Sequence, residues 1–449
     1  MADAGRFDAP PIGPVEGHLL AYLHGLLAWC EDHPDVGRWP GLRAAGADAI
    51  DLIRAEAGRD APAIAAPAAA AGPVSAHLAA VAGRVGCHPL VRAAAVARAV
   101  DDLYGHLLVR PWQRAVVEAG GRVTPGDLVV TPDDGHLEVV YGGASRAVGP
   151  GRSGDHPART ARARIYTPAP GVPPIVFDGA LEGQLEDVLG RPRPLVTAHP
   201  NGSWEELALT PFPAGPRRPT EHRDTTVGLV EAAIGREAAI VALPELTGTL
   251  PVVDALRQLR PPEPTLIVAG SAHLRLGSRR ANAAHVWVAR ERWVVPAPRP
   301  LRVLKRVPYA GSMGAEPLTQ VADHVRVLTS GPWRLVVGIC RDTLDADILA
   351  ALIQLGVNLV VVPASSAKTA NLGAAAAGVA TGAPGIGLVA NGPRRFPGRP
   401  AADGGPTEVD VPLGIYCSPL DRVEPRLHAT CEPPGLCVFD VGRHEVVHK

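Results

Sequence analysis

The sequence predicts an α/β protein in which a mainly helical N-terminal domain precedes a larger domain of alternating strands and helices. Three observations lead to this prediction. An apolar stripe with helical spacing begins near residue 18, and from about residue 194 short apolar segments alternate with helical patterns. A length of 449 residues is also enough for two or three domains. Alternation of this kind is typical of sheets that are covered by helices.

The chain is expected to divide into three parts. Residues 1–150 would form the helical domain, with helices near 18–27 and 89–108, and its role is not indicated by any motif. Glycine, serine, proline and arginine are frequent around its end, a composition that disfavours regular structure. We therefore expect residues 151–195 to be a linker and residues 196–449 to be the second domain.

The second domain should contain strands that end close to polar residues. Short apolar runs without helical spacing predict buried strands, whereas longer periodic segments predict helices. We expect strands at 206–209, 239–243, 265–270, 284–288, 335–339, 358–363, 385–390 and 435–441, with helices at 225–234 and 344–355.

Composition excludes several classes of function. The formal net charge is −1, which offers no basic surface for nucleic acid or anionic membrane, so neither is expected as a partner. No run of about 18 apolar residues predicts a membrane-spanning helix, and the N-terminus lacks the pattern of a signal peptide. The six cysteines form no CxxC pair. We expect a cytoplasmic protein with free thiols.

Three polar residues follow predicted strands and have complementary chemistry. Cys340 ends the run 335–339, Glu245 follows a strand that Pro244 terminates, and Lys305 closes the run 301–304. A cysteine attacks carbonyl or nitrile carbon as the thiolate, so it needs a base nearby. Glu245 could take the thiol proton, and Lys305 could stabilise the oxyanion that then develops.

Each residue of this trio also has an ordinary explanation. A buried cysteine is commonly a small apolar side chain, a Pro-Glu pair often begins a loop, and a lysine in a basic stretch is commonly a surface residue. The ordered combination of Glu245, Lys305 and Cys340 is therefore the signal, and no single member is sufficient.

That combination resembles the nitrilase superfamily, the carbon–nitrogen hydrolases, in which Glu, Lys and Cys occur in this order at strand ends. The resemblance covers roughly residues 200–443, and residues 1 to about 190 match no family that we can name. It rests on the segments 243–246, 305–308 and 338–342, with further similarity at 270–271, 282–284, 358–365, 390–392 and 396–398.

The resemblance implies a fold and an activity. The fold would be a four-layer α-β-β-α sandwich for the C-terminal domain, and the activity hydrolysis of a non-peptide C–N bond, expected to be that of a small amide. The mechanism would pass through a thioester on Cys340 and need no cofactor or metal. Members of the superfamily pair across the helix beside the nucleophile, so a homodimer or a higher homo-oligomer is expected.

The resemblance also implies supporting residues. Glu316 occupies the place of a second glutamate that orients the substrate or the lysine, and Ser365 and Asn391 lie in segments that would border the pocket. Arg341 replaces the aromatic residue that commonly follows the cysteine, so it would line the pocket and help to select the substrate, or point away. The histidine often found near the lysine is missing.

Other functions remain open at this point. An acyltransferase or a nitrile-acting enzyme would use the same trio, and a non-catalytic regulatory or scaffold protein could keep the fold. Residues 444–448 fit the HExxH pattern of zinc proteases, but they follow a strand and a turn, whereas the pattern needs a helix. Residues 365–368 fit S-x-x-K, without the further motifs of the serine–lysine enzymes.

Overall fold

The computed structural model describes most of the chain, and the account that follows is confined to this part. The described residues are 18–64, 70–123, 129–132, 157, 163–166, 173–209, 212–291, 299–311, 314–382, 385–397, 408–418, 426–441, 443 and 445–447. No helix within these ranges is both long enough and apolar enough to cross a membrane.

The chain forms two compact units. The first comprises Met1–Ala115, Leu128–His136 and Val148–Thr167, and the second comprises Val116–Asp127, Leu137–Ala147 and Pro168–Lys449. Each unit is described by itself.

The first unit is mainly helical, as the sequence predicts. Its helices are α1 (Leu19–Asp32), α2 (Trp39–Ala45), α3 (Ala47–Arg59), α4 (Ala71–Ala82) and α5 (Pro89–Glu118), with a short 3-10 turn η2 (Val36–Arg38). Their apolar faces meet in one core that includes Leu23, Trp39 and Val96. A two-stranded sheet of β2 (Val129–Pro132) and β3 (Ala163–Tyr166) also belongs to this unit.

The second unit contains two large sheets. The eight-stranded sheet has the order β1 (Arg122–Val123), β4 (Ile175–Asp178), β14 (Val325–Ser330), β15 (Trp333–Val337), β16 (Leu359–Ala364), β17 (Ile386–Asn391), β20 (Gly414–Cys417) and β21 (Arg426–Ala429). The seven-stranded sheet has the order β11 (Leu301–Leu304), β10 (Arg279–Ala289), β9 (Thr265–Leu276), β8 (Ile240–Ala242), β5 (Leu195–His199), β22 (Gly435–Asp440) and β23 (Glu445–Val447). Parallel strands, β15-β16-β17 and β5-β8-β9, lie at the centre of each sheet.

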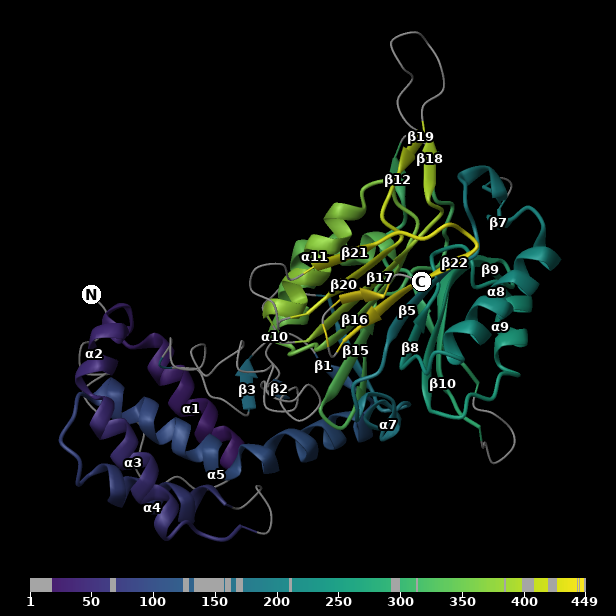
Figure 1. Ribbon diagram of the computed structural model, residues 1–449. Helices are drawn as coiled ribbons and strands as arrows, with labels where there is room; N and C mark the ends of the chain where they lie inside the picture. The colour runs from purple at the N-terminus through teal and green to yellow at the C-terminus, as the bar shows by residue number, and fades with distance from the viewer. Residues whose placement is uncertain are drawn as a thin grey trace. The chain divides into compact units, whose positions relative to one another are not determined.

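These sheets and their helices make four layers, so the predicted α-β-β-α sandwich is confirmed (Figure 1). Helices α8 (Pro219–Ile234) and α9 (Leu250–Leu256) cover the seven-stranded sheet, and α10 (Ala346–Gln354) and α11 (Thr369–Gly382) cover the other. Alternation along β5 shows how the sheets meet: Val196 and Ala198 join the core under α8 and α9, so Thr197 and His199 face the second sheet.

The sandwich begins earlier in the chain than residue 196. Strand β4 and helix α7 (Gln184–Leu189) fall within the expected linker 151–195, and strand β1 falls within the expected helical part. The apolar run 175–177 supplies two buried side chains to the sheet, Ile175 and Phe177, although prolines and a glycine surround it. These elements are short, and the residues around them have a composition typical of loops, so the sequence pattern does not reveal them.

Three short strand pairs complete the second unit. They are β6 (Leu207–Ala208) with β7 (Gly215–Pro216), β12 (Ala310–Gly311) with β13 (Gly314–Ala315), and β18 (Arg395–Pro397) with β19 (Glu408–Asp410).

Candidate active site

Cys340 lies in a strained turn at the end of β15. The strand is buried along its length, and a 3-10 turn, η6 (Cys340–Leu344), follows before α10 begins at Ala346. Cys340 has φ +50°, in the left-handed region that non-glycine residues rarely adopt. A Cβ at Gly338 would lie 2.5 Å from the side chain of Thr343, so the turn closes tightly on this glycine. Strain of this kind is common where a side chain is held for function.

Glu245 is delivered from the other sheet, three residues after β8. The chain turns at once, with Leu246 at φ +66°. Gly270 of β9 permits this turn because a Cβ there would lie 2.1 Å from the carbonyl oxygen of Pro244. The backbone N–H of Glu245 donates to Ala364 at the end of β16, 3.2 Å away. The turn that carries Glu245 is therefore tied to the sheet that carries the cysteine.

Lys305 follows β11 and is almost completely buried, with 1% of its surface exposed. Its Nζ lies 2.7 Å from Oε1 of Glu245 and 2.8 Å from Oε2 of Glu316. Its backbone N–H donates to Asn282, which fixes the start of the loop against β10. Burial lowers the pKa of Lys305, but the charges of Glu245 and Glu316 outweigh it and raise that pKa above its usual value. The lysine is held as a cation between two carboxylates.

Cys340 completes the group that the sequence predicts. Its thiol interacts electrostatically with Glu245 and Lys305, and the backbone of Ser365 lies close to it. Burial and then the charge of Glu245 raise the pKa of Cys340 to about 12, against the smaller effect of Lys305. The resting side chain is therefore a protonated thiol, and forming a thiolate requires that a neighbouring base accept the proton.

Glu316 has two further donors that the sequence analysis did not place in the site. His273 of β9 donates from Nε2 to Oε1 at 2.7 Å, and Asn282 of β10 donates to the same oxygen at 2.8 Å. The backbone N–H of Ala214 donates to Nδ1 of His273, which places the ring proton on Nε2. Asn282 also donates to Glu245 at 2.9 Å. The register of β9 and β10 pairs His273 directly with Asn282, and that register was the missing signal.

The pKa of Glu316 reflects these donors. Burial would raise it, but the hydrogen bond from His273 and the charge of Lys305 lower it to about 2. Glu316 is therefore ionised at any physiological pH.

Asp342 joins the cysteine turn to the lysine loop. Its Oδ1 accepts from the backbone N–H groups of Arg306 at 3.0 Å and Val307 at 2.7 Å, and its Oδ2 accepts from Ile339 at 3.2 Å. Burial raises the pKa of Asp342 to about 6, although the N–H of Val307 and the charge of Lys305 lower it. This residue was also absent from the predicted site.

The loop after β16 lies against the thiol, and Asn391 holds it. Oδ1 of Asn391 accepts from the N–H of Ser366 at 2.9 Å, while Nδ2 donates to Ser366 and Thr369. Asn391 is completely buried, so it supports the loop that brings the backbone of Ser365 close to Cys340. The hydroxyl of Ser365 is buried without a hydrogen-bond partner among the described residues.

Other candidates fall outside this group. Nη1 of Arg341 donates to the carbonyl of Ala310 at 3.1 Å, so the side chain is anchored to strand β12. Lys368 is exposed, and its backbone N–H donates to Ser366 rather than to Ser365. His444 and His448 of the HExxH pattern lie outside the described residues, as does Gly398.

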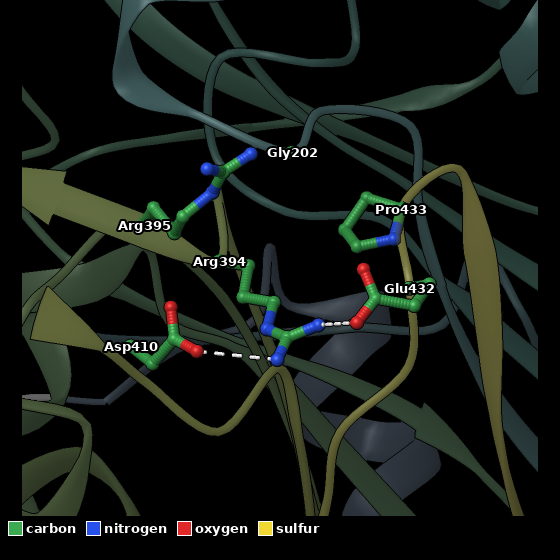
Figure 2. A pocket seen from close by; sticks show the side chains of 6 residues that line it. All are labelled: Gly202, Arg394, Arg395, Asp410, Glu432 and Pro433. Carbon is green, nitrogen blue, oxygen red and sulfur yellow. Dashed lines mark hydrogen bonds and ion pairs between the residues drawn. The ribbon is translucent and has the colours of Figure 1, made fainter. Parts of the chain in front are cut away.

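A separate cavity of about 320 Å³ lies elsewhere in the second unit (Figure 2). Its lining is polar, with Arg394 paired to Asp410 at 3.1 Å and to Glu432. Gly202, Arg395 and Pro433 complete it. The site of Cys340, Glu245 and Lys305 contributes none of these lining residues.

Among the comparisons with known proteins, only the comparison with solved structures found similar proteins. No protein-family model matches the sequence, and no curated protein matches it. A crystal structure of an amidase from Nesterenkonia sp. is 18% identical, with a TM-score of 0.38, and the match covers 56% of this chain and 90% of that one. These solved neighbours are amidases of the nitrilase superfamily.

Two mutants of the Nesterenkonia sp. AN1 amidase give similar values. One shows the result of Michael addition of acrylamide at its active-site cysteine; it is 18% identical with a TM-score of 0.39, over 56% of this chain and 93% of its own. The other is 20% identical with a TM-score of 0.37, over 56% of this chain and 90% of its own. The rest of this chain lies outside these matches.

Proposed function

We propose that the protein hydrolyses a non-peptide C–N bond in a small amide, with Cys340 as nucleophile, Glu245 as general acid and base, and Lys305 as the stabilising cation. One observation carries the proposal. A buried thiol in a strained turn interacts with a carboxylate that a buried lysine holds at 2.7 Å. Nucleophile, base and orienting group within reach of one another are what nucleophilic catalysis requires.

The mechanism begins with transfer of the thiol proton to Glu245. The sulfur of Cys340 bonds to the amide carbon, and the negative charge that develops on the amide oxygen is stabilised by the cation of Lys305. The tetrahedral intermediate then collapses, the C–N bond breaks, and Glu245 returns the proton to the leaving nitrogen. Ammonia or an amine departs, and a thioester remains on Cys340.

Hydrolysis of the thioester reverses these roles. Glu245 takes a proton from water, the water oxygen attacks the thioester carbon, and the C–S bond breaks. The carboxylic acid product leaves, and the sulfur regains its proton. The residues perform the cycle without a cofactor.

A homo-oligomer is part of the same proposal. The resemblance implies pairing across the helix beside the nucleophile, which is α10 in this chain. Sedimentation of the full-length protein should give at least a dimer, and a monomer at micromolar concentration would contradict this.

The experiment combines a panel of small amides and nitriles with intact-mass spectrometry. We expect at least one amide to give ammonia or amine, and rapid quenching to trap a mass increase equal to the acyl group on Cys340. Cys340→Ala should lose both signals, with turnover reduced by roughly a thousandfold or more. Cys87→Ala, which changes a half-buried thiol in the first unit, is the matched control and should keep both.

Two outcomes would speak against this proposal. If Cys340→Ala turned over substrate as fast as the wild type, Cys340 would not be the nucleophile. If no compound of the panel acylated Cys340, a non-catalytic role would be favoured. Addition of free amines to a productive reaction separates hydrolysis from acyl transfer, because transfer would yield a new amide in place of the acid.

A further inference from the structure

Two cysteines and a histidine meet between the two sheets. Cys437 lies in β22 directly opposite Thr197 of β5, and Gly435 lies opposite His199. Thr197 and His199 face the second sheet, so Cys437 does as well. Cys431 precedes β22 and reaches the same place, with 3.6 Å between its Sγ and that of Cys437.

Three ligand atoms are thereby gathered in a small volume. A sulfur from each of Cys431 and Cys437 and a ring nitrogen of His199 all lie within 4.8 Å of one another. His199 is completely buried and Cys437 is 2% exposed, whereas Cys431 is half-buried and gives the group a side open towards the surface. The hydroxyl of Thr197 lies 2.7 Å from Nε2 of His199, and Thr197 is also the register partner of Cys437, so it adjoins two of the three.

Two glycines make room for this group. A Cβ at Gly435 would lie 3.1 Å from the sulfur of Cys431, and a Cβ at Gly414 of the second sheet would lie 2.9 Å from the Cβ of Cys437. Any other residue at either position would push a thiol away from its present place.

The separation of the sulfurs distinguishes between two chemistries. A disulfide needs about 2.05 Å between the sulfurs, well below the 3.6 Å observed here. Two thiolates on one tetrahedral zinc ion, with Zn–S bonds of about 2.3 Å, lie about 3.8 Å apart. A disulfide would also use only the two sulfurs, whereas a zinc ion would bind His199 as well.

We propose that Cys431, Cys437 and His199 form a binding site for one Zn²⁺ ion. Sulfur and imidazole are the ligands that zinc prefers, and three protein ligands leave a fourth position for water. Binding replaces the two thiol protons, so each zinc releases two protons to solvent. Two thiolates, one neutral imidazole and Zn²⁺ sum to zero charge, which suits a site buried between sheets. The ion would fasten the segment before β22 to strand β5.

The polar cavity borders the segment that carries Cys431. Glu432 follows Cys431 in the chain, and both Glu432 and Pro433 line that cavity (Figure 2).

The test uses the full-length protein, reduced, stripped with a chelator and kept free of oxygen. Zn²⁺ is titrated in competition with a chromogenic indicator, and Co²⁺ is added separately because thiolate–cobalt bonds give a near-ultraviolet charge-transfer band. We expect one Zn²⁺ per chain, the charge-transfer band with Co²⁺, and a higher melting temperature with zinc. Cys431→Ser and Cys437→Ser should each weaken zinc binding by roughly 100-fold or more and reduce the band.

Controls separate this site from the active site. Cys87→Ser should leave binding unchanged, and Cys340→Ser should bind zinc as the wild type does. Cys431 is half-buried, so Cys431→Ser is the variant expected to fold; circular dichroism checks this. If Cys437→Ser fails to fold, the zinc titration and the cobalt spectrum of the wild type still show whether the chain binds one ion through thiolates.

Several results would overturn the assignment. Reduced wild-type protein that takes up no stoichiometric zinc would do so, as would zinc binding that is lost in Cys340→Ser but retained in Cys431→Ser. A Cys431–Cys437 disulfide found by peptide mapping in air, together with no zinc uptake after reduction, would assign the pair to redox chemistry instead.

Discussion

At the scale of single residues, Lys305 is held by two carboxylates rather than one. Glu245 interacts with the thiol of Cys340, while Glu316 accepts from His273 and Asn282. The lysine thus has a fixed position before any substrate arrives, which is how a charged group stabilises an oxyanion without reorganising. In the proposed mechanism Glu316 is a positioning residue, and His273 acts through it.

His273 is the residue at which this arrangement can be tested. His273→Ala removes a hydrogen bond to a charged group, so we expect the pKa of Glu316 to rise by about one to two units. Because Lys305 then loses part of its support, kcat should fall by about tenfold with KM less affected. On the acidic side of its pH profile, kcat should begin to fall at a higher pH than in the wild type, because Glu316 becomes protonated earlier.

The conservative variant and a surface control complete this test. His273→Gln places an amide N–H near the position of Nε2 and should recover most of the lost activity. His324→Ala, which changes a histidine paired with an exposed aspartate, should have no effect. Equal losses for His273→Ala and His273→Gln would show that packing against Phe212, rather than the hydrogen bond, matters at this position.

The sequence predicts the trio and Glu316, but not His273 and Asn282, which donate to Glu316. Glu245, Lys305 and Cys340 follow apolar runs that are visible in the chain, and the structure brings them together. His273 and Asn282 lie inside strands, where their function depends on which residues they face across the ladder. Pairing register is set by the whole sheet, so a single sequence does not reveal it.

At the scale of elements, Asp342 links two segments that come from different sheets. The cysteine turn follows β15 and the lysine loop follows β11, and the Asp342 carboxylate accepts N–H groups from both. Its pKa of about 6 makes this link depend on pH.

The sign of that dependence follows from the raised pKa. The folded chain binds the Asp342 proton more tightly than the unfolded chain, whose aspartate has a pKa near 3.8. Its contribution to stability is therefore fully present below about pH 3.8 and is lost as pH rises through about 6. Between pH 7 and pH 4.5 this single group should add about 2 kcal/mol to the free energy of unfolding.

Urea unfolding of matched variants isolates the effect from other carboxylates. The difference in unfolding free energy between wild type and Asp342→Asn should change by that amount between the two pH values. Asp347→Asn, which alters an exposed carboxylate on the following helix, is the matched control for the Asp-to-Asn substitution itself. A constant difference for Asp342→Asn would contradict the raised pKa.

Helix α11 shows where prediction from sequence failed for an element. Its fourteen residues include three glycines and many alanines, and they carry few large apolar side chains to mark a stripe. Glycine disfavours helices intrinsically, so packing on β16 and β17 must supply the stability. The central strands, by contrast, are continuous apolar runs and were predicted to within a few residues.

At the scale of the whole molecule, the second unit depends on close contact between its two sheets. Gly414 of β20 lies against the opposite sheet, where an added Cβ would come 2.7 Å from Oγ1 of Thr197 and 2.9 Å from Cζ of Phe439. These atoms belong to buried strands, so there is little freedom to move.

Two glycine substitutions should therefore act in opposite directions. We expect Gly414→Ala to lower the free energy of unfolding by about 1–3 kcal/mol through overpacking. Gly378→Ala, on an open face of helix α11 with no atom within 4 Å, should raise it by about 0.5–1 kcal/mol. Urea unfolding measures both, and a neutral Gly414→Ala would mean that the sheets separate more easily than their packing implies.

At this scale the class of fold and the order of the two domains along the chain could be predicted from the sequence. The sandwich, however, begins earlier in the chain than the predicted residue 196. Strands β1 and β4 join the eight-stranded sheet at its edge, and both are short segments within loop-like composition. Edge strands gain their stability from a neighbour that is distant in sequence, here β14 beside β4. Local patterns alone therefore place the boundary too late.

The cluster around Lys305 also has a consequence for the ionic character of what can bind there. One lysine cation stands beside two carboxylates, Glu245 and Glu316, so the group carries an excess of one negative charge. The guanidinium of Arg341 is turned to the carbonyl of Ala310 and does not face the pair. A molecule bearing its own carboxylate next to the reacting carbon would be repelled, whereas uncharged and cationic molecules would be admitted.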